Sequence, residues 1–376
     1  MHIPGILLSI LGFLVVIGPL VFVHEMGHYL AGRLFGVKAE TFSIGMGREL
    51  TGWTDKRGTR WKLSILPLGG YVKFAGDMGP ASEPDPAWLR LPPEEKAKTL
   101  QGKPVWQRFL IVAAGPITNF IVAIAIFAGF FAVYGVPKTP ALISGVMTGS
   151  AAEQAGIRPG DLIVSISGRS VDRFEQVQEM IFLRPGQRVT VGVMRGGTLI
   201  ELPTVPKTVT ETDSAGNKSD RGLLGVMPGP QVVERKGPIG VLGAALDATW
   251  NTVRMMVDVI GQIVGGERSA RELGGPLKIA QYSGQTVSLG WLPLVHFMAL
   301  ISINLGFINL LPIPLLDGGH LFFYLIEGVW RRPLPAKAQE WAFRSGLAVL
   351  LGFMLFVTMN DLGSFGLWRK LAGLIG

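Results

Sequence analysis

The sequence begins with an apolar run that is long enough to cross a membrane. Residues 3–23 carry no charged side chain, and about 20 apolar residues span a bilayer core as a helix. Runs at about 109–136, 291–316 and 342–360 have the same character, and the last has the shortest charge-free core. Only 16% of the 376 residues are charged, which is low for a soluble domain. We therefore expect a polytopic α-helical membrane protein with four transmembrane helices.

The distribution of cations predicts the orientation of these helices. Twelve Lys or Arg lie within residues 33–103, and three more lie within 331–337. The positive-inside rule places both loops in the cytoplasm, which leaves the termini and the segment between the second and third runs outside. The two cations at 369–370 argue weakly against this orientation. The net charge of +8 does not indicate nucleic-acid binding, because no basic stripe alternates with aromatic residues.

A metal-binding pattern lies at the end of the first run. His24 and His28 are four residues apart, with Glu25 between them. On a helix this spacing puts two imidazoles on one face, where they can bind one divalent metal next to a carboxylate. The alternative is a chance match in which the histidines only mark the membrane interface. Ionisable groups at such a position are costly unless metal and water hold them, which favours the metal.

The third ligand is expected after the third run. Pro312 and Pro314 cannot continue a helix, and irregular backbone at membrane depth is tolerated where it is buried or lines a cavity. Asp317 follows as an acid in apolar surroundings. Because the first and third runs both end on the cytoplasmic side, Asp317 is expected at the depth of His24 and His28. The chain has no cysteine, so any metal must use His, Asp or Glu.

Other polar residues near these segments have more than one interpretation. Gly115-Pro116-Ile117-Thr118-Asn119 allows close helix packing, but the amide of Asn119 needs a partner and is a candidate neighbour of the metal. His320 is a possible ligand, although Asp317 already completes a set of three. His296 lies within the third run and is expected to pack or to form a hydrogen bond.

The cytoplasmic loop and the middle segment contain shorter elements. Strands at Glu49–Thr54 and Thr59–Leu68 are predicted to form a membrane-associated β-hairpin, which either plugs the site or adds a strand to an extended substrate. Residues 77–104 are expected to form an irregular loop, and 208–222 a polar loop insert. The charges in 239–264 predict a helix that lies on the membrane surface.

Residues 137–207 resemble a PDZ domain. The run from Ala152 through Gly160-Asp161 to Gly168 carries the resemblance, and it is followed by a predicted helix at 174–183 and strands at 188–195 and 198–205. The resemblance implies an inserted α+β domain that recognises peptide ends, or a steric filter that binds nothing tightly. The expected divisions are 1–34, 35–104 with the hairpin, 105–136, 137–230 with the PDZ domain, 231–290 with the surface helix, 291–330, and 331–376.

Taken together, the motifs resemble the site-2 protease family of intramembrane zinc metalloproteases, in its bacterial RseP-type branch. The resemblance covers nearly the whole chain and rests on these segments: His24-Glu25-x-x-His28, Phe42-Ser43-Ile44-Gly45, Gly115-Pro116-x-x-Asn119 and Asn309-Leu310-Leu311-Pro312-x-Pro314-x-Leu316-Asp317-Gly318. The chain has room for one PDZ domain where well-known members have two.

The resemblance implies a role for each site residue. His24, His28 and Asp317 would bind Zn²⁺, and Glu25 would act as general base. Asn309 would lie near the substrate backbone. In addition, Asn119 and Pro312 are our further candidate substrate contacts.

The implied protein is a zinc endopeptidase of the bacterial inner membrane that cleaves single-span membrane proteins, such as anti-sigma factors or remnant signal peptides. Its PDZ domain and both termini would be periplasmic, and its active site would lie near the cytoplasmic side. Two other functions are weighed against this one. The first is a non-catalytic scaffold that recruits partners through the PDZ domain. The second is a metal transporter, which lacks the expected series of intramembrane acidic or histidine sites.

Overall fold

The structure, a computed structural model, describes residues 5–77, 91–182, 184–212, 218–266, 270, 274–332 and 334–364. The chain forms two compact units. The elements lying mainly in the first unit are α1 (Ile6–Leu34), β1 (Ala39–Thr54), β2 (Arg60–Phe74), α2 (Pro93–Lys96), α3 (Val105–Tyr134), α7 (Pro276–Leu289), α8 (Trp291–Leu310), α9 (Asp317–Trp330) and α10 (Ala336–Ser364).

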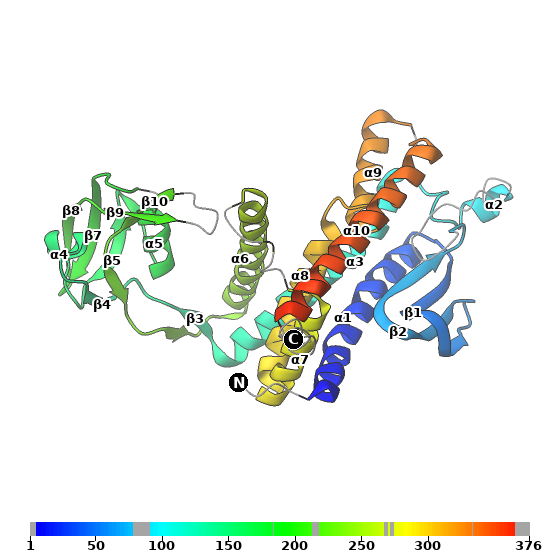
Figure 1. Ribbon diagram of the computed structural model, residues 1–376, viewed down its shortest axis with the longest axis horizontal. Coiled ribbons are helices and arrows are strands. Elements are labelled where there is room, and N and C mark those ends of the chain that lie inside the picture. The colour runs from blue at the N-terminus through cyan, green and yellow to red at the C-terminus, as the bar shows by residue number, and fades with distance from the viewer. Residues whose placement is uncertain are drawn as a thin grey trace, which may run out of the picture. The chain divides into compact units, whose positions relative to one another are not determined.

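Four described helices are long and apolar enough to cross a membrane, which confirms the four predicted spans. They are α1, α3, α8 and the part of α10 from Lys337 to Gly363. The third ends at Leu310 rather than at residue 316, because the Pro312 and Pro314 segment stops the helix. A separate helix, α9, then begins at Asp317. Figure 1 shows α9 joined to α8 by this short connection.

The predicted hairpin is present, but its strands are longer than expected: β1 and β2 replace Glu49–Thr54 and Thr59–Leu68. The Asp55 carboxylate stabilises the turn by accepting from the backbone N–H groups of Arg57 and Thr59. The extra length bends back on itself, since Phe42 pairs with both Trp61 and Val72. The predicted irregular loop contains only the short helix α2 among its described residues, and positions 78–90 lie outside them.

Helix α7 packs directly against α1, a contact that the sequence did not suggest. A Cβ built on Gly12 of α1 would lie 2.8 Å from the backbone of Ser283 and Gly284, and one on Gly284 would lie 2.8 Å from Cα of Ser9. Small residues let membrane helices approach to backbone contact. At its start, α7 is held by Asp361 of α10, whose carboxylate accepts from the backbone N–H groups of Gly275 and Lys278.

The second unit contains the middle segment of the chain. Its strands are β3 (Val136–Lys138), β4 (Ile143–Val146), β5 (Leu162–Ile166), β6 (Arg169–Ser170), β7 (Val189–Arg195), β8 (Thr198–Thr204), β9 (Lys207–Thr212), β10 (Lys218–Leu223), β11 (Val226–Pro228) and β12 (Val232–Glu234). The helices α4 (Ala151–Gln154) and α5 (Phe174–Phe182) lie between these strands in sequence, and α6 (Pro238–Val264), which the two units share, follows. The largest sheet has the order β6-β5-β7-β8.

This α+β segment has its own apolar core, formed by buried side chains that include Ile163, Val191 and Val177. The buried Asp161 accepts hydrogen bonds from the guanidinium of Arg195 at 2.7 Å and from the backbone N–H of Arg158 at 2.8 Å. Hydrogen bonding from Arg195 holds the pKa of Asp161 below its ordinary value. The Gly-Asp turn singled out in the sequence therefore closes on β7.

Two predictions for this segment have different outcomes. Helix α5 and strands β7 and β8 lie within one residue of their expected bounds. The predicted loop insert at 208–222 is wrong in part, because β9 and β10 pair as an antiparallel hairpin from Lys207–Leu223 to Thr212–Lys218. The polar composition hid the strands: β9 has Thr at three alternate positions and β10 has three charged residues, so neither shows an apolar alternation. Residues 213–217 lie outside the described ones.

The contact between α1 and α7 predicts opposite effects for two alanine substitutions on the same helix. Gly12→Ala places a methyl group against the backbone of α7, and overpacking of this kind costs about 1–3 kcal/mol. Gly18→Ala is the matched control, because its Cβ meets nothing within 4 Å, and alanine is favoured over glycine in a helix by about 0.5–1 kcal/mol. Thermal unfolding in detergent should show a lower Tm for the first variant only. An equal shift for both would contradict the close contact.

Candidate metal centre

The motif residues of α1 face the interior of the first unit. His24, Glu25 and His28 are each 8% exposed. The helix packs against the hairpin and against α8 on this part of its surface. The two imidazoles are neighbours, with ring centroids 4.9 Å apart. The four-residue spacing therefore puts both rings on one buried face, as the sequence predicts.

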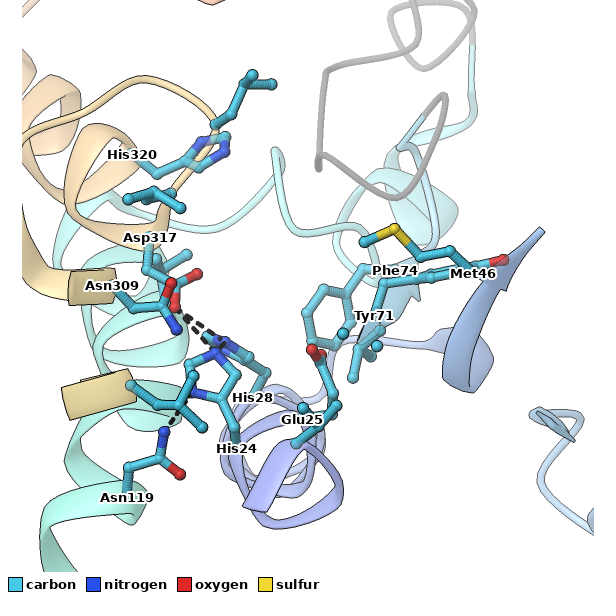
Figure 2. Close-up of a pocket in the computed structure, with 18 of the residues that line it drawn as sticks. His24, Glu25, His28, Met46, Tyr71, Phe74, Asn119, Asn309, Asp317 and His320 are labelled. Carbon is cyan, nitrogen blue, oxygen red and sulfur yellow. Dashed lines mark hydrogen bonds and ion pairs between the residues drawn. The ribbon is translucent and has the colours of Figure 1, made fainter. Parts of the chain in front are cut away.

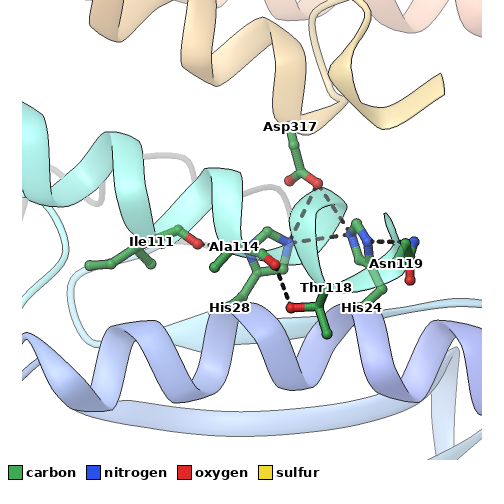
Figure 3. A network of polar contacts seen from close by, with 7 residues as sticks. All are labelled: His24, His28, Ile111, Ala114, Thr118, Asn119 and Asp317. Atoms are coloured by element: carbon green, nitrogen blue, oxygen red, sulfur yellow. Dashed lines mark hydrogen bonds and ion pairs between the residues drawn. The ribbon is translucent and has the colours of Figure 1, made fainter. Parts of the chain in front are cut away.

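Helix α3 holds the ring of His28. The Nδ1 atom of His28 lies 3.0 Å from the backbone oxygen of Ile111, which accepts a hydrogen bond from the protonated Nδ1 and leaves Nε2 with a free lone pair. A Cβ built on Gly115 would lie 2.2 Å from His28 Nε2. Gly115 is therefore required for the ring to lie across α3. Figure 3 shows the His28 ring beside α3 and its contact with the Ile111 oxygen.

The ring of His24 meets the same helix one turn later. The side-chain nitrogen of Asn119 lies 3.1 Å from Nδ1 of His24. Between the two histidines, Gly27 packs on α3 so closely that a Cβ there would lie 2.4 Å from Thr118 Oγ1. The segment from Gly115 to Asn119 therefore packs closely on α1, as one interpretation of the sequence expected. It also brings Asn119 next to the candidate ligand His24, as the other interpretation expected.

Asp317 reaches the histidines from the start of α9. Leu315 has a φ of 81°, and a bulky residue in this left-handed region costs about 1–3 kcal/mol. The two following glycines let the first turn of α9 lie against the connection: a Cβ on Gly318 would be 2.1 Å from the oxygen of Leu311, and one on Gly319 would be 2.5 Å from that of Ile313. The turn after the prolines therefore fixes the position of Asp317.

Three ligand-type atoms converge at this point. Oδ2 of Asp317 lies 3.1 Å from Nε2 of His24 and 3.4 Å from Nε2 of His28, and the two Nε2 atoms are 3.3 Å apart. In a tetrahedral zinc site with bonds of about 2.0–2.2 Å, ligand atoms are separated by about 3.3–3.6 Å. Oδ2 of Asp317 is buried without a hydrogen-bond donor. Lone pairs that converge in this way repel one another unless a cation lies between them, so the three residues fit zinc.

A cavity of about 560 Å³ opens beside these atoms. Glu25 lies on its wall, between the histidines and the β2 residues Tyr71 and Phe74 (Figure 2). The hairpin approaches closely, because a Cβ on Gly70 would lie 2.9 Å from Cγ of Glu25. The rest of the wall is mainly apolar and includes Leu347 and Leu350 of α10. The cavity thus places a carboxylate next to the three converging atoms in surroundings that disfavour bulk water.

The remaining candidate residues are distributed around this cavity. Asn309 and His320 line it, and Figure 2 shows the Asn309 amide beside Asp317. Pro312 is exposed on the connection and is not among the described residues that line the cavity. Ring contacts place His320 against Phe343 and His296 against Phe127. Neither histidine belongs to the group of ligand atoms formed by His24, His28 and Asp317.

A partly buried ion pair, which no sequence pattern indicates, holds α9 against α3. Arg108 Nη2 lies 2.6 Å from Glu327 Oε1, and the guanidinium carbon of Arg108 lies 4.9 Å from the ring centre of Tyr324. Charges near two helix ends were the only signal in the sequence, and nothing there indicated which charges meet. The pair stabilises the position of the helix that begins with Asp317.

Comparison with known proteins gives a family match over most of the chain. Residues 12–353 match the family described as Peptidase family M50. A predicted zinc metalloprotease of Agrobacterium fabrum is 46% identical over 360 residues, covering 94% of this chain and 96% of that protein. One of Rhizobium meliloti is 43% identical, covering 93% and 95%. Metalloprotease MmpA of Caulobacter vibrioides is 35% identical, covering 98% and 99%.

A solved structure, the PDZ domain of the SdrC-like protein from Listeria innocua, covers 25% of this chain and 99% of that chain at 19% identity. Its TM-score of 0.20 is too low to support an argument. The family match and the relatives extend over both halves of the metal centre, from α1 to α9. The chain is a membrane protein that belongs to peptidase family M50.

Proposed function

We propose that this protein is a site-2-type zinc endopeptidase in which His24, His28 and Asp317 hold the metal and Glu25 is the general base. The convergence of the three ligand atoms beside the Glu25 carboxylate is the observation that supports this assignment best. The names of the relatives, two predicted zinc metalloproteases and one metalloprotease, agree with it.

The chemistry follows from the residues around the cavity. When bound, zinc lowers the pKa of a water molecule to about 7 and polarises the scissile carbonyl. Glu25 accepts a proton from the attacking water and delivers it to the leaving amine nitrogen. The Asn309 amide, beside Asp317, is placed to donate a hydrogen bond to the carbonyl oxygen or to the substrate backbone. The apolar wall keeps other water away and strengthens these interactions.

The substrate class is proposed from the setting of the site. The metal centre lies at the end of a membrane-spanning helix, so a peptide bond reaches it within or near the bilayer. Residues Gly69–Val72 of β2 line the cavity next to Glu25 and offer an extended segment to a substrate strand. Single-span membrane proteins, such as anti-sigma factors or remnant signal peptides, satisfy these requirements. Asn119 and Pro312 remain further candidate contacts for such a strand.

The cellular setting is part of the same proposal. Cations within 33–103 and 331–337 favour a cytoplasmic position for these loops in a bacterial inner membrane. The α+β segment from β3 to β12 is then periplasmic, and its PDZ-like order of motifs favours a role in recognising the substrate or a partner. A membrane-surface position for α6 belongs to this arrangement.

A non-catalytic scaffold is the competing function. A structural metal site needs ligands and no base. Glu25 is nevertheless buried on the wall of a cavity large enough for substrate atoms, next to the ligands. This position favours catalysis over the scaffold.

Replacing the base separates catalysis from metal binding. Glu25→Gln keeps the size of the side chain but cannot accept the proton, so cleavage of a reconstituted single-span substrate should fall by about 10²–10⁴-fold. The zinc content of the purified variant should stay at one per chain. Unchanged cleavage would refute the role of Glu25, and cleavage that survives removal of zinc by a chelator would refute the metal mechanism.

Adding one methyl group to α3 should displace the ring of the ligand His28 without changing the histidine itself. Gly115→Ala places a Cβ against the His28 ring, whereas Gly129→Ala on the same helix meets nothing within 4 Å. Zinc affinity, measured by competition with a chromogenic chelator, should fall at least tenfold for the first variant. It should be unchanged for the second. Equal affinities would show that His28 does not need the close passage over Gly115.

A further inference from the structure

We propose that Asn119 is a positioning residue for His24: its amide oxygen accepts a hydrogen bond from Nδ1–H and thereby presents Nε2 to the metal. The inference rests on the proposed zinc site and assigns to Asn119 a role other than direct contact with substrate. It also explains why a polar side chain is buried within a membrane-spanning helix.

The position of Asn119 suits this role. The residue has no exposed surface, and its amide lies 3.1 Å from Nδ1 of His24. Asp317 meets the same ring at the other nitrogen, since its Oδ2 lies 3.1 Å from Nε2. In Figure 3, Asn119 and Asp317 contact the His24 ring at different nitrogens. Asn119 therefore acts on the ring and not on the metal.

The chemistry of imidazole decides which amide atom faces the ring. A neutral imidazole can bind a metal through Nε2 only if its proton is on Nδ1, and Nδ1 is then a donor that needs an acceptor. Oδ1 of Asn119 is buried and has no donor when Nδ2 faces the ring. Rotation of the planar amide by 180° exchanges the two atoms in nearly the same space. The rotated amide satisfies Oδ1 and fixes the tautomer that binds metal.

The backbone around Asn119 is held from a second helix. Ser302 of α8, which is also fully buried, donates its hydroxyl to the backbone oxygen of Asn119 at 2.8 Å. The contact of Gly27 with Thr118 fixes α3 against α1 on the preceding residue. Asn119 is thus held relative to both α1 and α8, so its amide can orient the ring with little loss of freedom on metal binding.

Helix α3 supplies an acceptor to each of the two histidines. His28 donates from Nδ1 to the backbone oxygen of Ile111. With the Asn119 amide rotated, His24 donates from Nδ1 to Oδ1 of Asn119, at the position 3.1 Å away that the amide occupies. Acceptors of this kind fix the ring orientation of metal ligands, and their loss lowers metal affinity by about 10–100-fold. Only the second acceptor is a side chain, so only Asn119 can be tested by substitution.

The experiment compares Asn119→Leu with Asn119→Asp in the full-length protein purified in detergent. Leucine has nearly the same size and no acceptor, whereas aspartate keeps an acceptor oxygen. Competition with a chromogenic chelator should give zinc affinity about 10–100-fold weaker for Asn119→Leu. For Asn119→Asp it should equal or exceed that of the unmodified protein. The absorption spectrum of the Co²⁺-substituted protein should change in the leucine variant and be retained in the aspartate variant.

Two controls keep this result separate from other failures. Gly129→Ala adds a methyl group to the same helix at a position where a Cβ meets nothing within 4 Å, and it should leave zinc affinity unchanged. His24→Ala must bind zinc more weakly than the unmodified protein, and if it does not, the zinc site itself is wrong. Should His24→Ala lose affinity while Asn119→Leu does not, the inference for Asn119 is overturned alone. An aspartate variant as weak as the leucine variant would also overturn the acceptor role.

Discussion

The meeting of two imidazoles and one carboxylate in apolar surroundings is the interaction on which the rest of this structure depends. The atoms lie 3.1–3.4 Å apart although they come from residues 24, 28 and 317. Ionisable groups at the end of a membrane-spanning helix are costly unless a partner compensates them. The surrounding features, from close glycine contacts to buried acceptors, all serve to bring α1, α3 and α9 to this point.

Backbone proximity makes the convergence possible. Gly27 and Gly115 remove the methyl groups that would separate α1 from α3, and Gly318 and Gly319 do the same where α9 turns back on the connection. The strained Leu315 is held in place by these contacts. Because the ligands sit on closely packed elements, the site depends on packing that lies several residues away from the metal position, and the Arg108–Glu327 pair extends this dependence to the far end of α9.

Much of the architecture was predictable because it follows from local patterns. Long charge-free runs predicted the four spans, and the two prolines predicted that the helix of the third opens, although its end was placed six residues too late. The Asp55 turn predicted a hairpin but not its length, since the pairing of Phe42 with two segments of β2 is a tertiary event. The hairpin of β9 and β10 was missed because its sequence is polar. The contact of α7 with α1 was missed because two glycines 272 residues apart carry no mutual signal in one sequence.

The sequence by itself determined which residue types meet: a His-Glu-x-x-His face on one helix and an acid after a proline-broken span, both at the same end of their helices. Periodicity and hydropathy are local, so they determine faces and depth. Only the tertiary structure decided which atoms come into contact. It placed Nδ1 of His28 on the Ile111 oxygen, the Asn119 amide on His24, and Gly70 beside Glu25. These contacts depend on how far each packed helix is rotated and how closely it approaches its neighbour. A difference of a few ångströms decides them, and a local sequence pattern does not specify it.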